Sequence, residues 1–262
     1  TWTDVKQMLI IFAGLAMCVV VIVSALPGDV TLGDALHLAG AAGKLQTLDF
    51  SFDLTERYTV WSGFFAALFL FLSYFGCDQS QVQRFLTARS VDEGRTSLMM
   101  SAFLKIPLQF LILLSGVLVF VFYQFRPAPL VLNAMEAEQA ANARPAEYEV
   151  LETEITTLHL QRQDAAVQYL AARDAGNSDI ERVIYVAASD AYRDKRVEAT
   201  EFVREANSNP SFTDVNYVFP TFVINNMPIG VVGLIIAAIL AAAMSSVAAE
   251  LNSLATASTM DF

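Results

Sequence analysis

The chain has 262 residues, of which 55% are hydrophobic and only 16% are charged, whereas a soluble domain carries about 25% charged residues. The composition therefore excludes an ordinary soluble domain and a disordered or collagen-like chain. The formal net charge of −11 excludes a basic nucleic-acid binder, and two cysteines are too few for a disulfide scaffold or a cysteine-rich metal site. The charge is also uneven, because residues 136–205 hold 15 of the 27 acidic and 8 of the 16 basic residues. We therefore expect an apolar part that lies in the membrane and a charged part around residues 136–205 that lies in water, which we call the water-like segment.

Four apolar stretches are long enough to form membrane-spanning helices, since about 20 residues cross a hydrocarbon core of roughly 30 Å. They run over residues 7–26, 58–76, 98–125 and 229–251. Helices are expected because an isolated strand would leave its backbone groups unpaired in lipid. The sequence therefore predicts an all-α, polytopic membrane protein with about four transmembrane helices, and we interpret it as an internal fragment of a longer protein.

The short loops predict the orientation of these helices. The 77–97 loop carries three arginines, whereas the 27–57 loop carries one lysine and one arginine among five acidic residues. Because Lys and Arg favour the cytoplasmic side, we expect residues 77–97 inside and residues 27–57 and 126–228 outside.

The water-like segment predicts a pair of helices. Apolar residues recur at alternating spacings of three and four, with Arg162 in the one polar slot, which is a heptad pattern. The stripe comprises Tyr148, Leu151, Ile155, Leu158, Ala165, Tyr169 and Ala172. A turn at residues 175–178 precedes a second, weaker stripe that starts at Ile180. We expect an antiparallel helical hairpin outside the membrane over residues 134–212, either as a solvated insertion or as a coiled coil for a partner.

No catalytic motif is found. The sequence has no glycine-rich phosphate loop, HExxH, GxSxG or CxxC motif, and His37 and His159 lie in polar contexts without a second ligand at helical spacing. We therefore expect no enzyme activity and no organic cofactor.

Polar side chains near or within the apolar stretches are the candidate functional residues, because such groups are costly in lipid and usually line a solute path or pair with a partner. Lys105 lies roughly 10 Å into the third stretch, where it either hydrogen-bonds a solute or snorkels to the cytoplasmic interface. Tyr74 ends the second stretch, either as a lid or as an aromatic-belt residue. Asp4 follows Thr3 at the start of the first helix, where a cap is the simplest role.

Ser245 and Ser246 lie deep in the fourth stretch among alanines. Small residues permit close helix packing, which is one interpretation. The other is a sodium site, since a hard cation needs several oxygen ligands and the two hydroxyls with the carbonyl of Ala242 supply three. Further ligands would come from another helix with an unwound backbone.

Several strings resemble the sodium:solute symporter family, the sodium/glucose cotransporter-like family, in its bacterial form. They cover all four apolar stretches, within residues 1–133 and 213–262, and leave the hairpin outside. The strings are Trp2-Thr3-Asp4-Val5, Asp78-Gln79-Ser80-Gln81-Val82-Gln83-Arg84, Ala102-Phe103-Leu104-Lys105, Ala242-Ala243-Met244-Ser245-Ser246 and Leu251-Asn252-Ser253.

The resemblance implies a fold of two inverted five-helix repeats, with core helices five to seven in residues 1–133 and core helix eight in residues 213–262. It further implies specific residue roles. These are sodium binding at Ala242, Ser245 and Ser246, gating by Tyr74, a substrate-side lysine at Lys105, and an aspartate linked to ion release at Asp4.

Two departures from the family pattern narrow these expectations. Ala248 and Ala249 replace the further hydroxyls of members that bind a second sodium ion, which favours a single sodium. Phe71 stands where the sugar transporters have a polar amide three residues before the gating tyrosine, which disfavours a galactose-like substrate.

The resemblance implies sodium-coupled symport of a small solute across the plasma membrane by alternating access, in a multi-pass protein of the bacterial inner membrane. Na⁺ would be the coupling ion, and the solute a sugar, amino acid, carboxylate or inorganic anion. The main alternative is a solute-sensing module of a membrane-bound signalling kinase. A passive channel is a third hypothesis, but none of the four stretches carries the continuous polar stripe that a channel would show.

Overall fold

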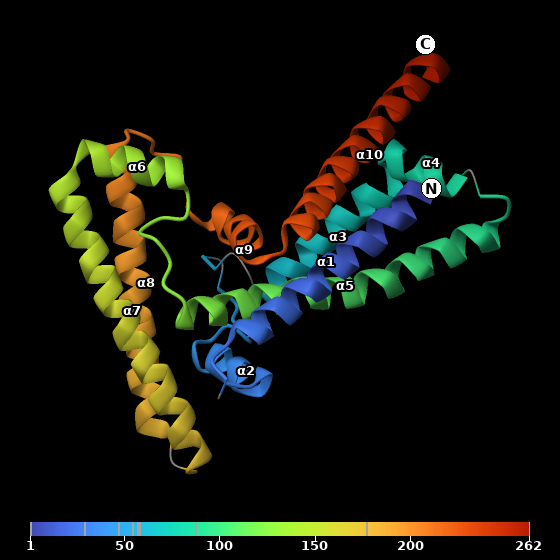
Figure 1. Ribbon diagram of the computed structural model, residues 1–262. Coiled ribbons are helices and arrows are strands. Elements are labelled where there is room, and N and C mark those ends of the chain that lie inside the picture. Colours follow the sequence, from blue (N-terminus) through green and yellow to red (C-terminus); the bar gives the residue numbers. More distant parts are fainter. Residues whose placement is uncertain are drawn as a thin grey trace. The chain divides into compact units, whose positions relative to one another are not determined.

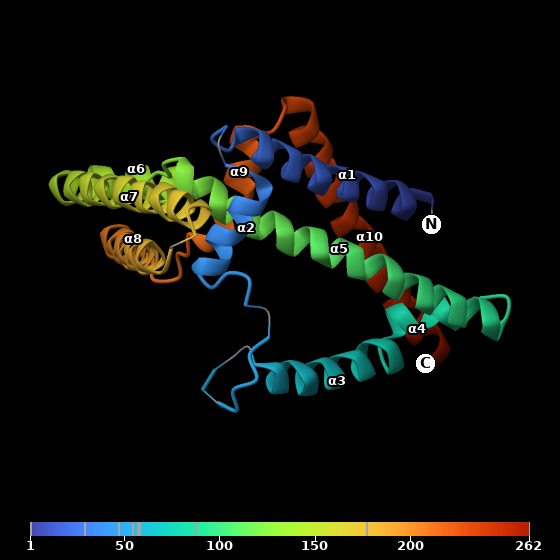
Figure 2. The ribbon, with the colours of Figure 1, turned by 90° about the horizontal axis from the view of Figure 1, so that it is seen from below.

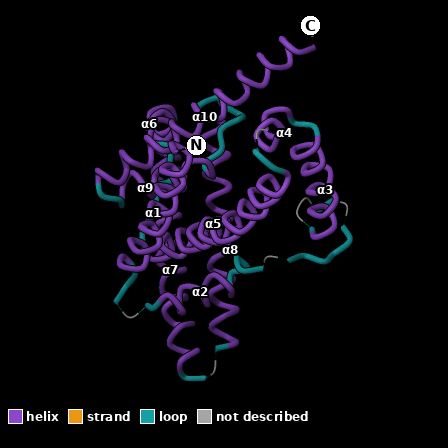
Figure 3. The backbone as a smooth tube through the Cα atoms, turned by 90° about the vertical axis from the view of Figure 1, so that its right-hand side faces the viewer, coloured by secondary structure: helices purple, strands orange, loops and turns teal. Residues whose placement is uncertain are grey.

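The computed structural model describes residues 2–28, 30–46, 48–53, 55–56, 59–86, 88–176 and 178–261, without the side chains of residues 2–4, 84–86 and 260–261. All regular secondary structure in these residues is helical (Figure 3), which confirms the predicted all-α class. The chain divides into two compact units. Unit 1 comprises residues 1–16, 46–113 and 230–262, and unit 2 comprises residues 17–45 and 114–229.

Unit 1 contains most of the apolar sequence. Its helices are α3 (Val60–Gly76), α4 (Gln79–Leu86), α10 (Ile229–Asp261) and the first parts of α1 (Trp2–Ala25) and α5 (Val91–Phe125). Stretches long and apolar enough to cross a membrane occur in α1, α5 and α10, and α3 is a shorter apolar helix of 17 residues. These four helices match the four predicted stretches and support the predicted polytopic membrane protein.

All three long helices extend beyond the predicted stretches, and α1 begins at Trp2. α5 begins at Val91, where Asp92 and Glu93 in the first turn favour a helix N-terminus. α10 continues past residue 251 because its later hydroxyls bond to carbonyl oxygens of the same helix: Thr256 Oγ1 donates to Asn252 O at 2.8 Å. Such bonds let polar residues continue an apolar helix without unpaired groups.

Side-chain hydrogen bonds join α4 to α10 within unit 1. The Gln83 amide nitrogen donates to Thr256 Oγ1 at 3.3 Å, and Asn252 Nδ2 approaches Gln83 Oε1 at 3.5 Å. One amide therefore bridges two residues that lie four positions apart on the same face of α10.

Unit 2 contains the water-like segment. Its helices are α2 (Leu32–Ala41), α6 (Ala134–Ala143), α7 (Pro145–Asp174), α8 (Asp179–Ala206) and α9 (Val218–Asn226), with a 3-10 turn at Val215–Tyr217. α7 and α8 run antiparallel and side by side (Figures 1 and 2), as the sequence predicts, and α6 packs against both. The separate helix α6 was not expected. It arises because Asn133 caps its start and Pro145 begins α7.

The heptad stripe of α7 faces the core of the hairpin. Leu151, Ile155, Ala165 and Tyr169 are buried, as the spacing predicts. Leu151 and Ile155 belong to one buried cluster with Phe202 of α8, and Tyr169 stacks on Tyr185. The turn between the helices includes Gly176 at φ +81°, a conformation that favours glycine.

A partly buried ion pair closes the open end of the hairpin. Arg196 Nη2 lies 2.6 Å from Asp214 Oδ2, and Asp214 Oδ1 accepts from the backbone nitrogen of Leu132 at 2.6 Å. Arg196 also donates to the carbonyl oxygen of Pro129. Because each charged group has several partners, the pair holds the segments before α6 and after α8 together.

His159 is buried between the hairpin helices, although its sequence context is polar. Only 3% of the residue is exposed, its ring lies 6.0 Å from that of Tyr192, and Arg162 Nη2 donates to its Nδ1 at 3.0 Å. Burial, together with the neighbouring charge of Arg162, lowers the pKa of His159 to about 4. The imidazole is therefore neutral at pH 7 and accepts a hydrogen bond from Arg162.

We expect the hairpin to lose stability as the pH falls from 6.5 to 4. In this window the unfolded chain protonates His159 and the folded chain does not, and the loss is at most on the order of 3 kcal/mol. Thermal unfolding can be followed with fluorophores at the exposed positions Val150 and Val197. The His159→Gln variant, which keeps an acceptor for Arg162, should show a flatter pH dependence. An equal pH dependence in the two proteins would contradict this assignment.

Candidate functional site

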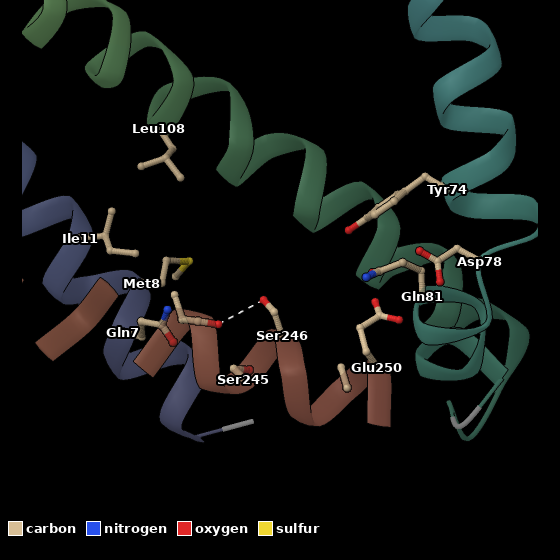
Figure 4. Close-up of a pocket in the computed structure, with 12 residues that line it drawn as sticks. Gln7, Met8, Ile11, Tyr74, Asp78, Gln81, Leu108, Ser245, Ser246 and Glu250 are labelled. Carbon is tan, nitrogen blue, oxygen red and sulfur yellow. Dashed lines mark hydrogen bonds between the residues drawn. The ribbon is translucent and has the colours of Figure 1, made fainter. Parts of the chain in front are cut away.

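A cavity of about 520 Å³ in unit 1 is bordered by one face of α10 (Figure 4). Ala242, Ser245, Ser246, Ala249 and Glu250 line it, and their spacing of three and four places them along a single helix face. α1, α3, α4 and α5 supply the opposing residues, together with the residue that links α3 to α4. These are Gln7, Met8, Ile11, Tyr74, Asp78, Gln81 and Leu108.

Small residues allow α10 to lie close to α1 beside this cavity. A Cβ atom added at Gly14 would lie 3.3 Å from Cγ1 of Ile235, tighter than ordinary van der Waals contact. Gly14 therefore permits the close approach of the two helices, a common use of glycine in membrane proteins.

Ser246 and Ala242 present a pair of neutral oxygen atoms to the cavity. Ser246 Oγ donates to the carbonyl oxygen of Ala242 at 3.1 Å, as a hydroxyl in an apolar helix commonly does. This separation is shorter than twice a hard-cation–oxygen distance of about 2.3–2.6 Å, so one cation can contact both atoms. Ser245 is half-buried in the same cavity and supplies a third oxygen.

Tyr74 borders the cavity near the C-terminal end of α3, and Lys105 lies beside it. The Lys105 ammonium is 5.9 Å from the centre of the Tyr74 ring and 6.0 Å from that of Phe75, within the range of a cation–π contact. Lys105 itself is exposed and does not line the cavity.

The structure thus brings four of the six predicted site residues to one cavity. They are Tyr74, Ala242, Ser245 and Ser246, with Lys105 adjacent to Tyr74. The predicted role of Asp4 falls outside the described side chains, although the residue itself lies in α1.

Two acidic residues of the cavity were not predicted from the sequence. Asp78 caps α4 through Oδ1, which accepts from Ser80 N at 2.9 Å and from Ser80 Oγ at 2.7 Å. Glu250 lies four residues after Ser246, and this helical spacing indicates from the sequence that it lies near the serine pair, about one turn further on. In Figure 4 the side chains of Asp78 and Glu250 lie at the same end of the cavity.

The cavity favours a cation electrostatically. Its described lining includes the carboxylates of Asp78 and Glu250 but no lysine or arginine. A cleft with one sign of charge raises the local concentration of the opposite ion. No group of three or more His, Cys, Asp or Glu residues that could hold a metal occurs in the described part of the chain. Near Ser246 the oxygen atoms that a cation could contact are its own hydroxyl and the carbonyl of Ala242.

Comparison with known proteins shows a similarity to one transporter family. A sequence model of the sodium:solute symporter family matches residues 199–262, which include all of α10 and the end of the hairpin helix α8. The family model therefore matches from residue 199, whereas the strings that resemble the family lie within residues 1–133 and 213–262. No solved structure is significantly similar to the chain.

Characterised relatives carry the similarity further along the chain. The sodium-dependent multivitamin transporter of Oryctolagus cuniculus is 32% identical over 130 residues, 48% of this chain and 19% of the relative. The human sodium/iodide cotransporter is 30% identical over 140 residues, 52% of this chain and 20% of the relative. The sodium/sialic acid symporter NanT of Aliivibrio fischeri is 47% identical over 57 residues, 20% of this chain and 11% of the relative.

The matched part of the chain spans about a fifth of the length of the first two relatives. The named relatives are sodium-coupled carriers of small solutes, and the described helices include three that are long and apolar enough to span a bilayer. These observations show that the chain is similar to the sodium:solute symporter family and support a multi-pass membrane protein.

Proposed function

We propose that this chain carries the sodium site and part of the solute path of a symporter that works by alternating access in the bacterial inner membrane. The observation that carries the proposal is the cavity of unit 1, which gathers Ser245, Ser246 and the Ala242 carbonyl around one face of α10. Sodium is a co-transported substrate in this proposal, and the protein is a transporter rather than an enzyme.

The neutral oxygens suit a monovalent ion that must leave in every cycle. Calcium sites usually recruit several carboxylates, whereas here two hydroxyls and one carbonyl are central and the carboxylates of Asp78 and Glu250 lie at one end. Ala248 and Ala249 lack hydroxyls, so we propose a single sodium ion per cycle.

We further propose that the solute is a small anion. Two of the three named relatives, the sodium/iodide cotransporter and the sodium/sialic acid symporter, carry iodide and sialic acid, which are anions at neutral pH. Lys105 supplies a positive charge beside the gating residue Tyr74, although its ammonium lies outside the cavity lining. A solute that reaches past Tyr74 would meet this charge.

Loss of the Ser246 hydroxyl should weaken sodium binding without unfolding the protein. Removing one charge-assisted contact costs about 1.5–3 kcal/mol, so Ser246→Ala should raise the sodium concentration for half-maximal uptake roughly 10- to 150-fold. The assay is uptake of radiolabelled iodide, monocarboxylates and sialic acid by the full-length protein in proteoliposomes.

Ser258→Ala is the matched control, because Ser258 is an exposed serine of the same helix outside the cavity. It should leave the sodium dependence unchanged. An unchanged sodium dependence in Ser246→Ala, or an equal change in both variants, would show that Ser246 is not a sodium ligand.

Lys105 should contribute to solute recognition through its charge. Lys105→Ala should raise the solute concentration for half-maximal uptake, while sodium-dependent conformational change, followed by Trp fluorescence, persists. Lys105→Arg keeps a cation near Tyr74 and should restore part of the affinity. Arg95→Ala on the same helix, at an exposed position, should have no effect. Wild-type uptake by Lys105→Ala would instead assign Lys105 to the membrane interface.

A further inference from the structure

A second cavity, of about 430 Å³, lies in unit 2 between the hairpin and the end of α5. α5, α7 and α8 line it together with the residues that follow α2 and the segments that flank the hairpin. Its size lies within the range of about 300–1,000 Å³ that is usual for small-molecule sites. None of its residues belongs to the sodium cavity of unit 1.

Aromatic rings form part of its wall, and two of them face cations. The Arg162 guanidinium lies 3.8 Å from the centre of the Tyr192 ring, and the Lys44 ammonium lies 5.4 Å from that of Phe120. All four residues line the cavity. Its surface therefore combines flat apolar faces with positive charge, which is the combination that recognises an anion with an apolar body.

The charges around this cavity are unbalanced. Among the residues that the structure describes, four cationic side chains line it, and Asp190 is the only acid that does. Two of the cations are neutralised: Arg193 pairs with Asp190 at 3.0 Å, and Arg196 pairs with Asp214 at 2.6 Å. For Lys44 and Arg162 no carboxylate lies within 4 Å in the part of the chain that the structure describes.

Arg162 is the more unusual of the two. It is only 4% exposed, and its partners are neutral: it donates to the carbonyl oxygen of Tyr123 and to His159 Nδ1. Its Nε has no hydrogen-bond partner among the described residues. Burial lowers the pKa of Arg162, which reflects the cost of a desolvated charge without a counterion. His159 stays neutral beside it and does not compensate that charge.

We propose that this cavity binds a small organic monoanion, a carboxylate attached to a flat apolar body. The carboxylate would pair with Lys44 and Arg162, and the apolar body would pack against Phe120 and Tyr192. The site lies wholly in unit 2 and is independent of the sodium site, so it stands apart from the proposed transport function.

Benzoate is the probe, titrated by calorimetry into the full-length protein in phosphatidylcholine nanodiscs. Benzamide has the same ring without the charge and should not bind measurably. Lys44→Gln and Arg162→Gln should each weaken benzoate binding by roughly 10-fold or more. Lys44 is exposed, so its variant remains informative if Arg162→Gln disturbs the hairpin. Lys195→Gln, at a lysine paired with Glu154 and Glu198 outside the cavity, should bind like the unaltered protein.

Sodium separates this site from the transport site. Benzoate should bind equally in sodium chloride and in choline chloride. It should also bind the Ser246→Ala variant, whether or not that variant shows a changed sodium dependence of uptake. Benzoate binding that requires sodium, or that persists unchanged in Lys44→Gln, would overturn the proposal. Equal binding of benzamide would also overturn the proposal. Displacement of benzoate when the nanodisc contains phosphatidylglycerol would overturn it as well, because that result would assign the cavity to a lipid headgroup.

Discussion

A hydroxyl group in an apolar helix must find a hydrogen-bond partner, and at Ser246 that partner is the carbonyl oxygen of Ala242. This requirement brings two neutral oxygens to 3.1 Å on a helix whose neighbouring residues are small. A different small residue, Gly14 of α1, permits a close approach to Ile235 of α10 in the same unit.

The two units treat buried charge in different ways. In unit 1 the charges are few, and both carboxylates of the cavity lining, Asp78 and Glu250, lie at its border. In unit 2 the hairpin buries Arg162 with a neutral histidine and an aromatic ring rather than with a carboxylate. A buried cation without a counterion is expensive, which is the physical reason to assign an anion to that cavity.

Periodicity in the sequence predicts the helices well, because apolar spacing reports which face is buried. It identified the stripe that includes Leu151, Ile155 and Tyr169, and the small-residue face that includes Ser246. It missed the burial of His159, since a polar sequence context does not reveal that Arg162 and Tyr192 enclose the ring. It also could not place Lys105 beside Tyr74, because that proximity depends on how α3 and α5, which are separated by α4, lie in space. The roles of the site residues came from resemblance and remain proposals.

Simultaneous uptake of ²²Na⁺ and labelled solute by the full-length protein in proteoliposomes measures directly how many sodium ions enter with each solute molecule. In the proposed site the Ala242–Ser246 segment would supply oxygens for one ion, and the alanines at 248 and 249 have no side-chain oxygens for a second. One sodium ion should enter with each solute molecule, and no solute should accumulate when potassium replaces sodium. Two sodium ions per solute, or solute accumulation without sodium, would contradict this expectation.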